Sequence, residues 1–192
     1  MYEHISLGSN CSITHQLEIY GLRTRSYPFD WARVTCKQLI KVLESNFLDY
    51  SILTMIKYSS AHSSLLIGNK YLIQFAHEIL SLDQLDQLEL SFERRVRRFQ
   101  NLIYSNNLVR FYRIELAPVK NNIFIDNANN IVKLLEKYTN LFVLVILIQK
   151  DSWELIDLTK LNNKVKLIHF ETFDPDWKMD QIDWNKVFNL YI

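Results

Sequence analysis

The chain is poor in the residues that interrupt or staple a fold. Its 192 residues include only three glycines, three prolines and two cysteines. A barrel or sandwich made of many tight hairpins needs more turn-forming residues than this, which argues against that architecture. Two cysteines that form no CxxC pair also argue against a disulfide framework and a structural zinc site. Free thiols fit a reducing compartment.

Charge of one sign, long apolar runs and nucleotide-binding motifs are also missing. Lys and Arg number 22 against 21 Asp and Glu, so no global field points to nucleic acid or an anionic membrane as partner. The most apolar run, Leu141–Ile148, is far shorter than the roughly 20 residues that span a bilayer. The N-terminus lacks the features of a signal peptide, and no GxGxxG, GxxxxGK[ST] or HExxH motif occurs. We therefore expect a cytoplasmic protein that binds no nucleic acid, membrane or metal.

The apolar pattern predicts one α/β domain over residues 1–192. Short apolar runs alternate with segments of helical period, as in crossover units. The run 142–148 is apolar on both faces, which is typical of a central parallel strand with helices on both sides. Gly68-Asn69 predicts a hairpin between 64–67 and 71–76. The expected fold class is a three-layer α/β domain with a mainly parallel central sheet flanked by helices, plus an antiparallel hairpin. The expected strands are 4–7, 108–114, 141–148 and 165–170, and the expected helices are 12–20, 35–47, 81–105, 127–138 and 183–191.

Three residues are expected to delimit helices. Gly21 would end the first helix, because glycine readily adopts the left-handed conformation found after helices. Thr35 and Ser81 would cap the starts of the second and third helices through their hydroxyl oxygens.

Cys11 follows the first expected strand, in Ser6-Leu7-Gly8-Ser9-Asn10-Cys11. Sites in open α/β sheets form at the carboxyl ends of strands. At the start of a helix, free N–H groups and the helix dipole would lower the pKa of a thiol and hold an oxyanion near Asn10–Ser12. Ser9 and Asn10 add polar groups for a substrate. The alternative is that Cys11 is an inert, packed thiol, the role we expect for Cys36.

A nucleophilic thiol needs a base, most often histidine. His77 is the best candidate, since it ends an expected strand and precedes Glu78, whose carboxylate could orient the ring. His15, four residues after Cys11, is the next candidate, and His169 ends the last strand. His4 and His62 are expected to have no catalytic role.

An aromatic loop and a basic helix complete the candidates. In Tyr27-Pro28-Phe29-Asp30-Trp31, Trp31 could line a pocket and Asp30 could orient an imidazole or cap the turn at Ala32. The run 94–98 carries four arginines, which we interpret as a solvated helix face. The alternative is an anion clamp formed with Arg110 or Arg113. The substrate-binding candidates are Ser9, Asn10, Arg25, Trp31 and Arg98.

These motifs resemble a family of uncharacterised domains that are described as papain-like cysteine peptidases. The family occurs in bacteria and large DNA viruses. The resemblance rests on the SLGxxC opening, the PFDW loop, His77, Arg98-Phe99 and Arg110-Phe111. It implies Cys11 as nucleophile, His77 as base and Glu78 or Asp30 as orienting acid. It also implies a peptide or small acyl substrate and no cofactor. The implied location is the cytoplasm of a bacterial cell or of a virus-infected host cell.

Two alternatives remain open at this stage. The strand–Gly–x–x–Cys–helix opening is also similar to that of capsule-biosynthesis acetyltransferases, which bind coenzyme A. In that case arginines would hold the cofactor's phosphates. The second alternative is a non-catalytic binding module in which Cys11 only packs.

Overall fold

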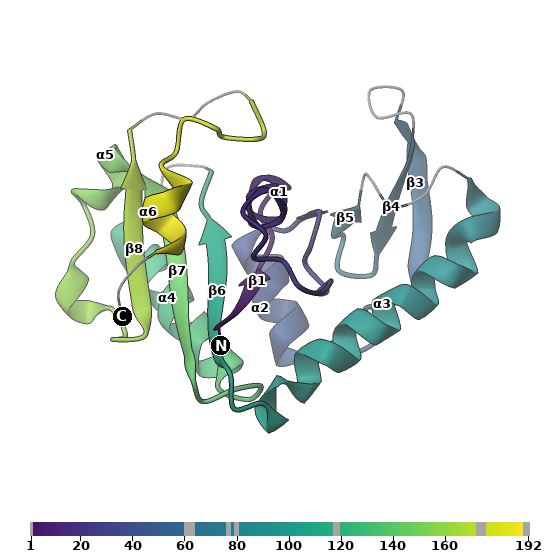
Figure 1. Ribbon diagram of the computed structural model, residues 1–192, viewed down its shortest axis with the longest axis horizontal. Helices are drawn as coiled ribbons and strands as arrows, with labels where there is room; N and C mark the ends of the chain where they lie inside the picture. Colours follow the sequence, from purple (N-terminus) through teal and green to yellow (C-terminus); the bar gives the residue numbers. More distant parts are fainter. Residues whose placement is uncertain are drawn as a thin grey trace.

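A four-stranded sheet, sheet A, organises the larger part of the protein (Figure 1). The computed structural model describes residues 2–59, 64–75, 78, 81–116, 120–171 and 176–189. All neighbouring strands of sheet A are parallel, which confirms the expected parallel sheet. Its order is β1 (Tyr2–Ser6), β6 (Leu108–Ile114), β7 (Phe142–Gln149) and β8 (Val165–Phe170).

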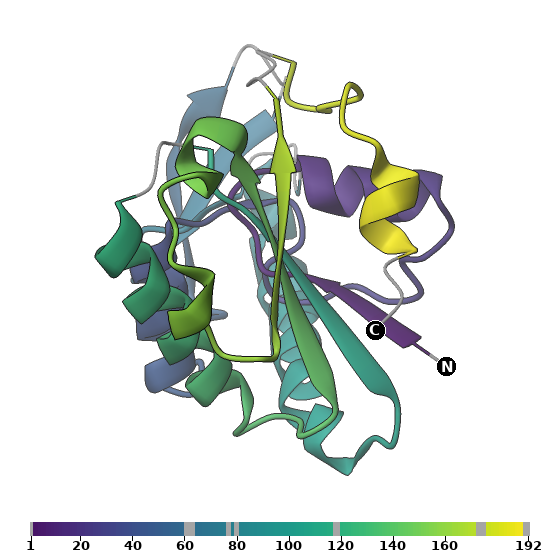
Figure 2. The same ribbon diagram turned by 90° about the vertical axis from the view of Figure 1, so that its left-hand side faces the viewer.

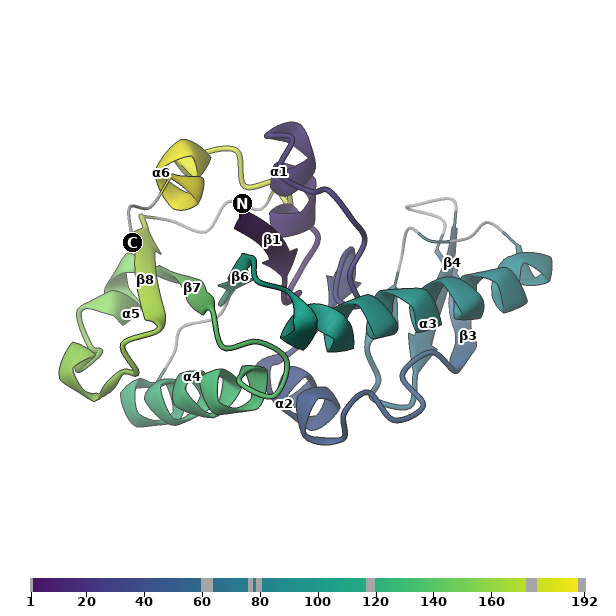
Figure 3. The ribbon, with the colours of Figure 1, turned by 60° about the horizontal axis from the view of Figure 1, so that its bottom comes forward.

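Helices cover both faces of sheet A, as the apolar run in β7 predicts (Figures 2 and 3). Successive side chains of a strand point to opposite faces. Phe111 and Leu144 therefore join one core with α2 and α4, whereas Tyr112 and Val145 join a second core with α1 and α6. The result is the expected three-layer arrangement. The covering helices are α1 (Ser12–Ile19), α2 (Cys36–Glu44), α4 (Asn121–Leu135) and α6 (Trp184–Phe188).

The expected hairpin is part of a larger antiparallel sheet, sheet B. The predicted partners do pair, through Ile67–Phe75 and Gly68–Gln74, but β4 also pairs along its length with a strand that the sequence left unassigned. Figure 1 shows sheet B beside α3 (Leu85–Gln100), away from β8. The strands in order are β2 (Ala32–Arg33), β5 (Gln74–Phe75), β4 (Ser64–Asn69) and β3 (Leu53–Ser59).

Two of the three expected helix boundaries are confirmed. Thr35 caps α2, and it forms a reciprocal capping box with Gln38. Gly21 has a φ of 66° and follows α1, where the Leu22 N–H donates to the Leu17 carbonyl at 2.8 Å. The Ser81 prediction is wrong, because a 3₁₀ turn, η1 (Leu82–Gln84), precedes α3.

Other helix limits also differ from the sequence pattern. The third expected helix ends as a 3₁₀ turn, η2 (Asn101–Tyr104), and α4 starts six residues earlier than expected. The short helix α5 (Lys150–Trp153) was not expected. The turn η3 (Leu158–Lys160) follows it and precedes β8. Among the residues described, no helix is long and apolar enough to cross a membrane.

Candidate active site

Cys11 lies at the carboxyl end of β1, where a tight turn leads into α1. Gly8 has a φ of 78°, and a Cβ there would lie 2.8 Å from the Val34 side chain, so only glycine fits. Ser9 also has a positive φ, of 96°. The turn therefore brings Cys11 to the N-cap position of α1, five residues after the end of β1. This is the placement expected from the sequence.

The polar groups around Cys11 are only partly available to a substrate. The Asn10 carboxamide oxygen accepts the Ser12 N–H at 3.1 Å and also the Ser12 hydroxyl. The Ser12 N–H is thus already bonded to Asn10. The expectation that it helps to hold an oxyanion is therefore wrong. Within the described residues, the Cys11 N–H makes no hydrogen bond, and the buried hydroxyl of Ser9 has no partner. These two groups remain as donors.

The thiol of Cys11 is half-buried, and its surroundings disfavour the thiolate. Burial raises the pKa of Cys11 to about 11, and the negative charge of Glu78 acts in the same direction. The expectation that the start of α1 lowers this pKa is therefore wrong for the described surroundings. Desolvation is the larger of the two effects, and in the described surroundings Cys11 is a neutral thiol at pH 7. Attack by this thiol therefore needs a nearby base that takes its proton.

Glu78 is held by Arg95 in a buried ion pair. Two guanidinium nitrogens donate to its two carboxylate oxygens at 2.6 and 3.0 Å, and each side chain is only 10% exposed. Arg95 also stacks on the ring of Phe92, 4.5 Å from its centroid. Glu78 comes three residues after β5, which pairs with β2 directly behind the Gly8 turn. The carboxylate is thereby held where its charge acts on the Cys11 thiol.

Asp30, the other candidate acid, holds the aromatic loop in shape. Its carboxylate accepts the Tyr27 N–H at 2.9 Å and the Arg23 guanidinium at 3.0 Å. It thus caps the turn at Tyr27 rather than at Ala32. Burial raises the pKa of Asp30, an effect that Arg23 partly offsets. Asp30 is a structural anchor for the loop that carries Trp31.

The histidines differ in their relation to Cys11. His77, together with His62, lies outside the described residues. His15 follows Cys11 by one helical turn, with its N–H donating to the Cys11 carbonyl at 3.0 Å. His4 binds the Tyr112 hydroxyl at 2.9 Å and has no place in the site, as expected.

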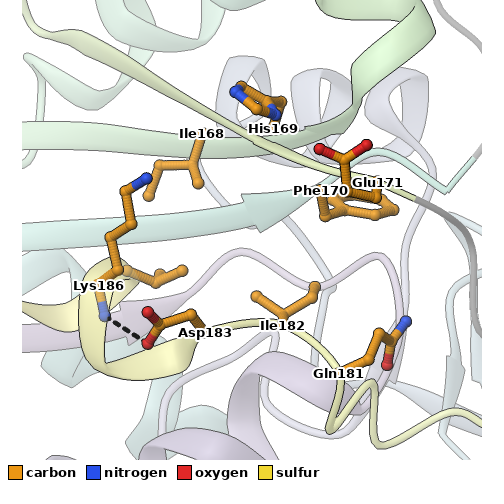
Figure 4. A pocket seen from close by; sticks show the side chains of 9 residues that line it. Ile168, His169, Phe170, Glu171, Gln181, Ile182, Asp183 and Lys186 are labelled. Atoms are coloured by element: carbon orange, nitrogen blue, oxygen red, sulfur yellow. Dashed lines mark hydrogen bonds between the residues drawn. The ribbon is translucent and has the colours of Figure 1, made fainter.

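His169 is on the wrong strand to serve Cys11. It lies on β8, three strands away from β1, or about 14 Å at the usual strand spacing. Its ring packs against Trp153 of α5, at 5.4 Å between centroids. A cavity of about 440 Å³ adjoins this strand end, lined by Ile168, Phe170 and Ile182 with Glu171 and Lys186 at its rim (Figure 4). It is separate from the Cys11 site.

The arginines do not form the solvated face that we expected. Arg94 and Arg97 are exposed, but Arg95 is buried, and Arg98 donates to the Ser26 carbonyl at 3.0 and 2.8 Å. The substrate-binding candidate Arg98 therefore braces the aromatic loop. Arg25 is exposed on that loop.

The clamp alternative fails because β6 sends its arginines to opposite faces. Arg110 points into the α6 side and donates to the Phe188 carbonyl at 2.6 Å. Arg113 lies on the α2 side, where it binds Glu115 and the carbonyl oxygens of Leu7 and Val34. Both side chains serve the fold.

Cys36 has the structural role that we expected. It lies at the first position of α2 and packs against the α2–α4 core. Burial raises the pKa of Cys36 to about 11, although Arg113 opposes this effect. In the described part of the chain, no group of three or more His, Cys, Asp or Glu residues could hold a metal ion.

Two functional candidates were missed by sequence reasoning. Arg95 was hidden in a basic run whose members look equivalent until the helix is placed in the fold. Trp177 lies in the segment 176–183, which lies beside α1 (Figure 3). The Gln16 carboxamide binds the Lys178 carbonyl and the Asp180 carboxylate of this segment. No local sequence signal shows either relation.

The fold and this site define a class: an α/β protein with a cysteine at the carboxyl edge of a parallel sheet. The sequence profile of the family "Putative papain-like cysteine peptidase (DUF1796)" matches residues 2–152, and the chain belongs to this family. An uncharacterized protein of Acanthamoeba polyphaga mimivirus, R408, is 28% identical to it over 95% of both chains. No solved structure matches the chain.

Proposed function

We propose that the protein is a cysteine-dependent hydrolase that cleaves an amide or ester bond, with Cys11 as nucleophile and His77 as base. The observation that carries this is the half-buried Cys11 at the start of α1, beside the fixed Glu78 carboxylate. Membership of the family supports it. A cytoplasmic location and a peptide or small acyl substrate are part of the proposal.

The neutral thiol requires that proton removal and attack occur together. His77 would take the proton from the Cys11 sulfur as the sulfur forms a bond to the substrate carbonyl carbon. The Cys11 N–H and the Ser9 hydroxyl would donate to the resulting oxyanion. As the carbonyl re-forms, the C–N or C–O bond breaks and His77 returns the proton to the leaving group. Water, activated by His77, then hydrolyses the thioester.

Glu78 would stabilise the imidazolium formed in the attack. A carboxylate fixed near the ring favours its charged form, as in other cysteine and serine hydrolases with an orienting acid. Because Arg95 holds both carboxylate oxygens, the acid cannot swing away from this position. The same charge opposes a resting thiolate, so it would act on the base rather than on the nucleophile.

The test compares four proteins on a library of fluorogenic peptide amides. The parent chain and Cys36→Ser should hydrolyse the same members, whereas Cys11→Ser and His77→Gln should lose at least about 10³-fold in kcat/KM. Cys36→Ser is the matched control, because it removes a half-buried thiol of similar pKa at another helix start. Equal hydrolysis by the parent chain and Cys11→Ser would refute the proposal, as would loss of activity in Cys36→Ser alone.

The parallel sheet favours a second candidate, a coenzyme A-dependent acyltransferase. That function needs arginines available to phosphate groups, but Arg95 and Arg98 are bound to Glu78 and Ser26. Of the four arginines of α3, only the exposed Arg94 and Arg97 would then be available to this cofactor. A thermal shift with coenzyme A distinguishes the two: a rise in Tm that grows with ligand concentration would favour the transferase.

A further inference from the structure

Three half-exposed rings meet next to the Cys11 turn. The ring of Trp177 lies 5.0 Å from that of His15 and 6.4 Å from that of Trp31, and the His15 and Trp31 rings are also 6.4 Å apart. They come from α1, the aromatic loop and the C-terminal segment. We call these three residues the aromatic platform.

The platform lies one helical turn from the thiol. Residues four apart in a helix share a face, and the His15 N–H is bonded to the Cys11 carbonyl. The Trp31 N–H donates to the hydroxyl of Thr14 at 3.3 Å, which ties the aromatic loop to the same helix. The rings therefore lie on the side of α1 that carries Cys11.

The platform is costly to the protein, which argues against an incidental cluster. Trp31 has a φ of 54°, a left-handed conformation that a bulky side chain rarely adopts. Trp177 keeps 42% of its surface exposed, although burying an indole is favourable. The neighbouring rings Tyr27 and Phe29 of the same loop are fully buried. Trp31, which contacts Thr14 and His15 of α1, stays partly exposed.

We propose that the aromatic platform is the subsite that binds an apolar, preferably aromatic, side chain on the acyl part of the substrate. Edge and face contacts with such a group would orient its carbonyl against the Cys11 sulfur. Asp30 and Arg98 then have a purpose at this subsite: they brace the loop that presents Trp31. The inference rests on the proposed role of Cys11 as the attacking atom.

Two alkylating reagents test the subsite without requiring hydrolysis. In the Cys36→Ser background, Cys11 is the single thiol, and its sulfur displaces iodide from iodoacetamide or from N-benzyliodoacetamide. The measured quantity is the ratio of the two second-order rate constants, benzyl over plain. This ratio cancels the thiolate fraction, which is common to both reactions. N-acetylcysteine gives the ratio for a thiol without a subsite.

We expect the ratio for the protein to exceed that for N-acetylcysteine by about three- to tenfold, the effect of one or two aromatic contacts. Trp177→Ala and Trp31→Gly should each reduce it toward the free-thiol value, and Trp177→Phe should retain most of it. Trp31→Gly suits the positive φ, so the loop keeps its shape. Tyr104→Ala, which removes a remote ring that is 85% exposed, is the control and should change nothing.

A protein ratio equal to that of N-acetylcysteine would overturn the inference. So would equal acceleration of both reagents in Trp177→Ala, because that result would show a cover over the thiol rather than a binding surface. Neither outcome would contradict the proposed hydrolase function if Cys11→Ser abolishes peptide hydrolysis. Failure of the proposed function is instead seen in that separate assay.

Discussion

The ion pair between Arg95 and Glu78 allows the sharpest quantitative prediction. Both side chains are 10% exposed and meet through two hydrogen bonds, so Arg95→Met leaves a buried, uncompensated carboxylate. Breaking a buried pair by removing one partner costs about 3–5 kcal/mol. For a chain of this size each kcal/mol lowers Tm by about 2–4 °C, so we expect a fall of about 10 °C.

The matched control lies on the same helix. Arg97 faces Glu93 at 3.7 Å, with side chains 75% and 46% exposed, so Arg97→Met should cost less than about 1 kcal/mol. Urea unfolding followed by circular dichroism gives both values. In the double variant Glu78→Gln/Arg95→Met no charge remains buried, and we expect it to recover at least about 2 kcal/mol relative to the sum of the single changes. A cost for Arg95→Met as small as that for Arg97→Met, or strict additivity, would refute the reasoning.

Three further predictions concern the same regions. In the Cys36→Ser background, the rate of Cys11 alkylation by iodoacetamide should still rise with pH above 9. Glu78→Gln should lower the midpoint of this pH–rate profile. A midpoint near pH 7 without the Glu78 change would contradict a neutral resting thiol. Desolvation lowers the pKa of His4 to about 4, so the free energy of unfolding should fall by about 1–2 kcal/mol, after solvent screening, as pH drops from about 6.5 to 4. His4→Gln should remove this part of the loss in pH-dependent urea unfolding. An unchanged pH profile in His4→Gln would count against the prediction. Gly8→Ala should cost about 2–4 kcal/mol through its contact with Val34, whereas Gly21→Ala, with open space and a similar φ, should cost about 1 kcal/mol; equal losses would show that crowding at Gly8 is unimportant.

The architecture of sheet A was predictable because its signals are local and strong. The strand β7 is apolar on both faces, which is typical of a parallel strand between two helical layers. Thr35 and Gly21 act through hydrogen bonds to residues at most a few positions away. Such signals can be read without knowing the fold.

Sheet B was only partly predictable. Its edge strand β3 mixes polar and exposed apolar residues, such as Thr54 and Met55, and its register shifts between Met55 and Lys57. The shift interrupts the alternation by which strands are recognised. Long-range pairing with β4 and β5, rather than local pattern, decides the structure of this segment.

The site was predictable at Cys11 but not in its surroundings. A cysteine after a strand and a glycine turn indicates its position, yet the pKa of the thiol depends on how deeply the fold buries it. The ion pair between Glu78 and Arg95 links a residue that follows β5 to the middle of α3. Trp177 joins the site only because a segment beyond β8 returns across α1. These relations arise from tertiary packing.

The most direct test of the account is to find which thiol becomes acylated during turnover. The protein is mixed with p-nitrophenyl acetate and quenched in acid within the first turnover, and intact and peptide mass spectrometry then locate the acetyl group. We predict a single acetyl thioester on Cys11 in the parent chain and in Cys36→Ser, and none in Cys11→Ser. An acetyl group on Cys36, or no thioester at all while p-nitrophenol is released, would contradict the account.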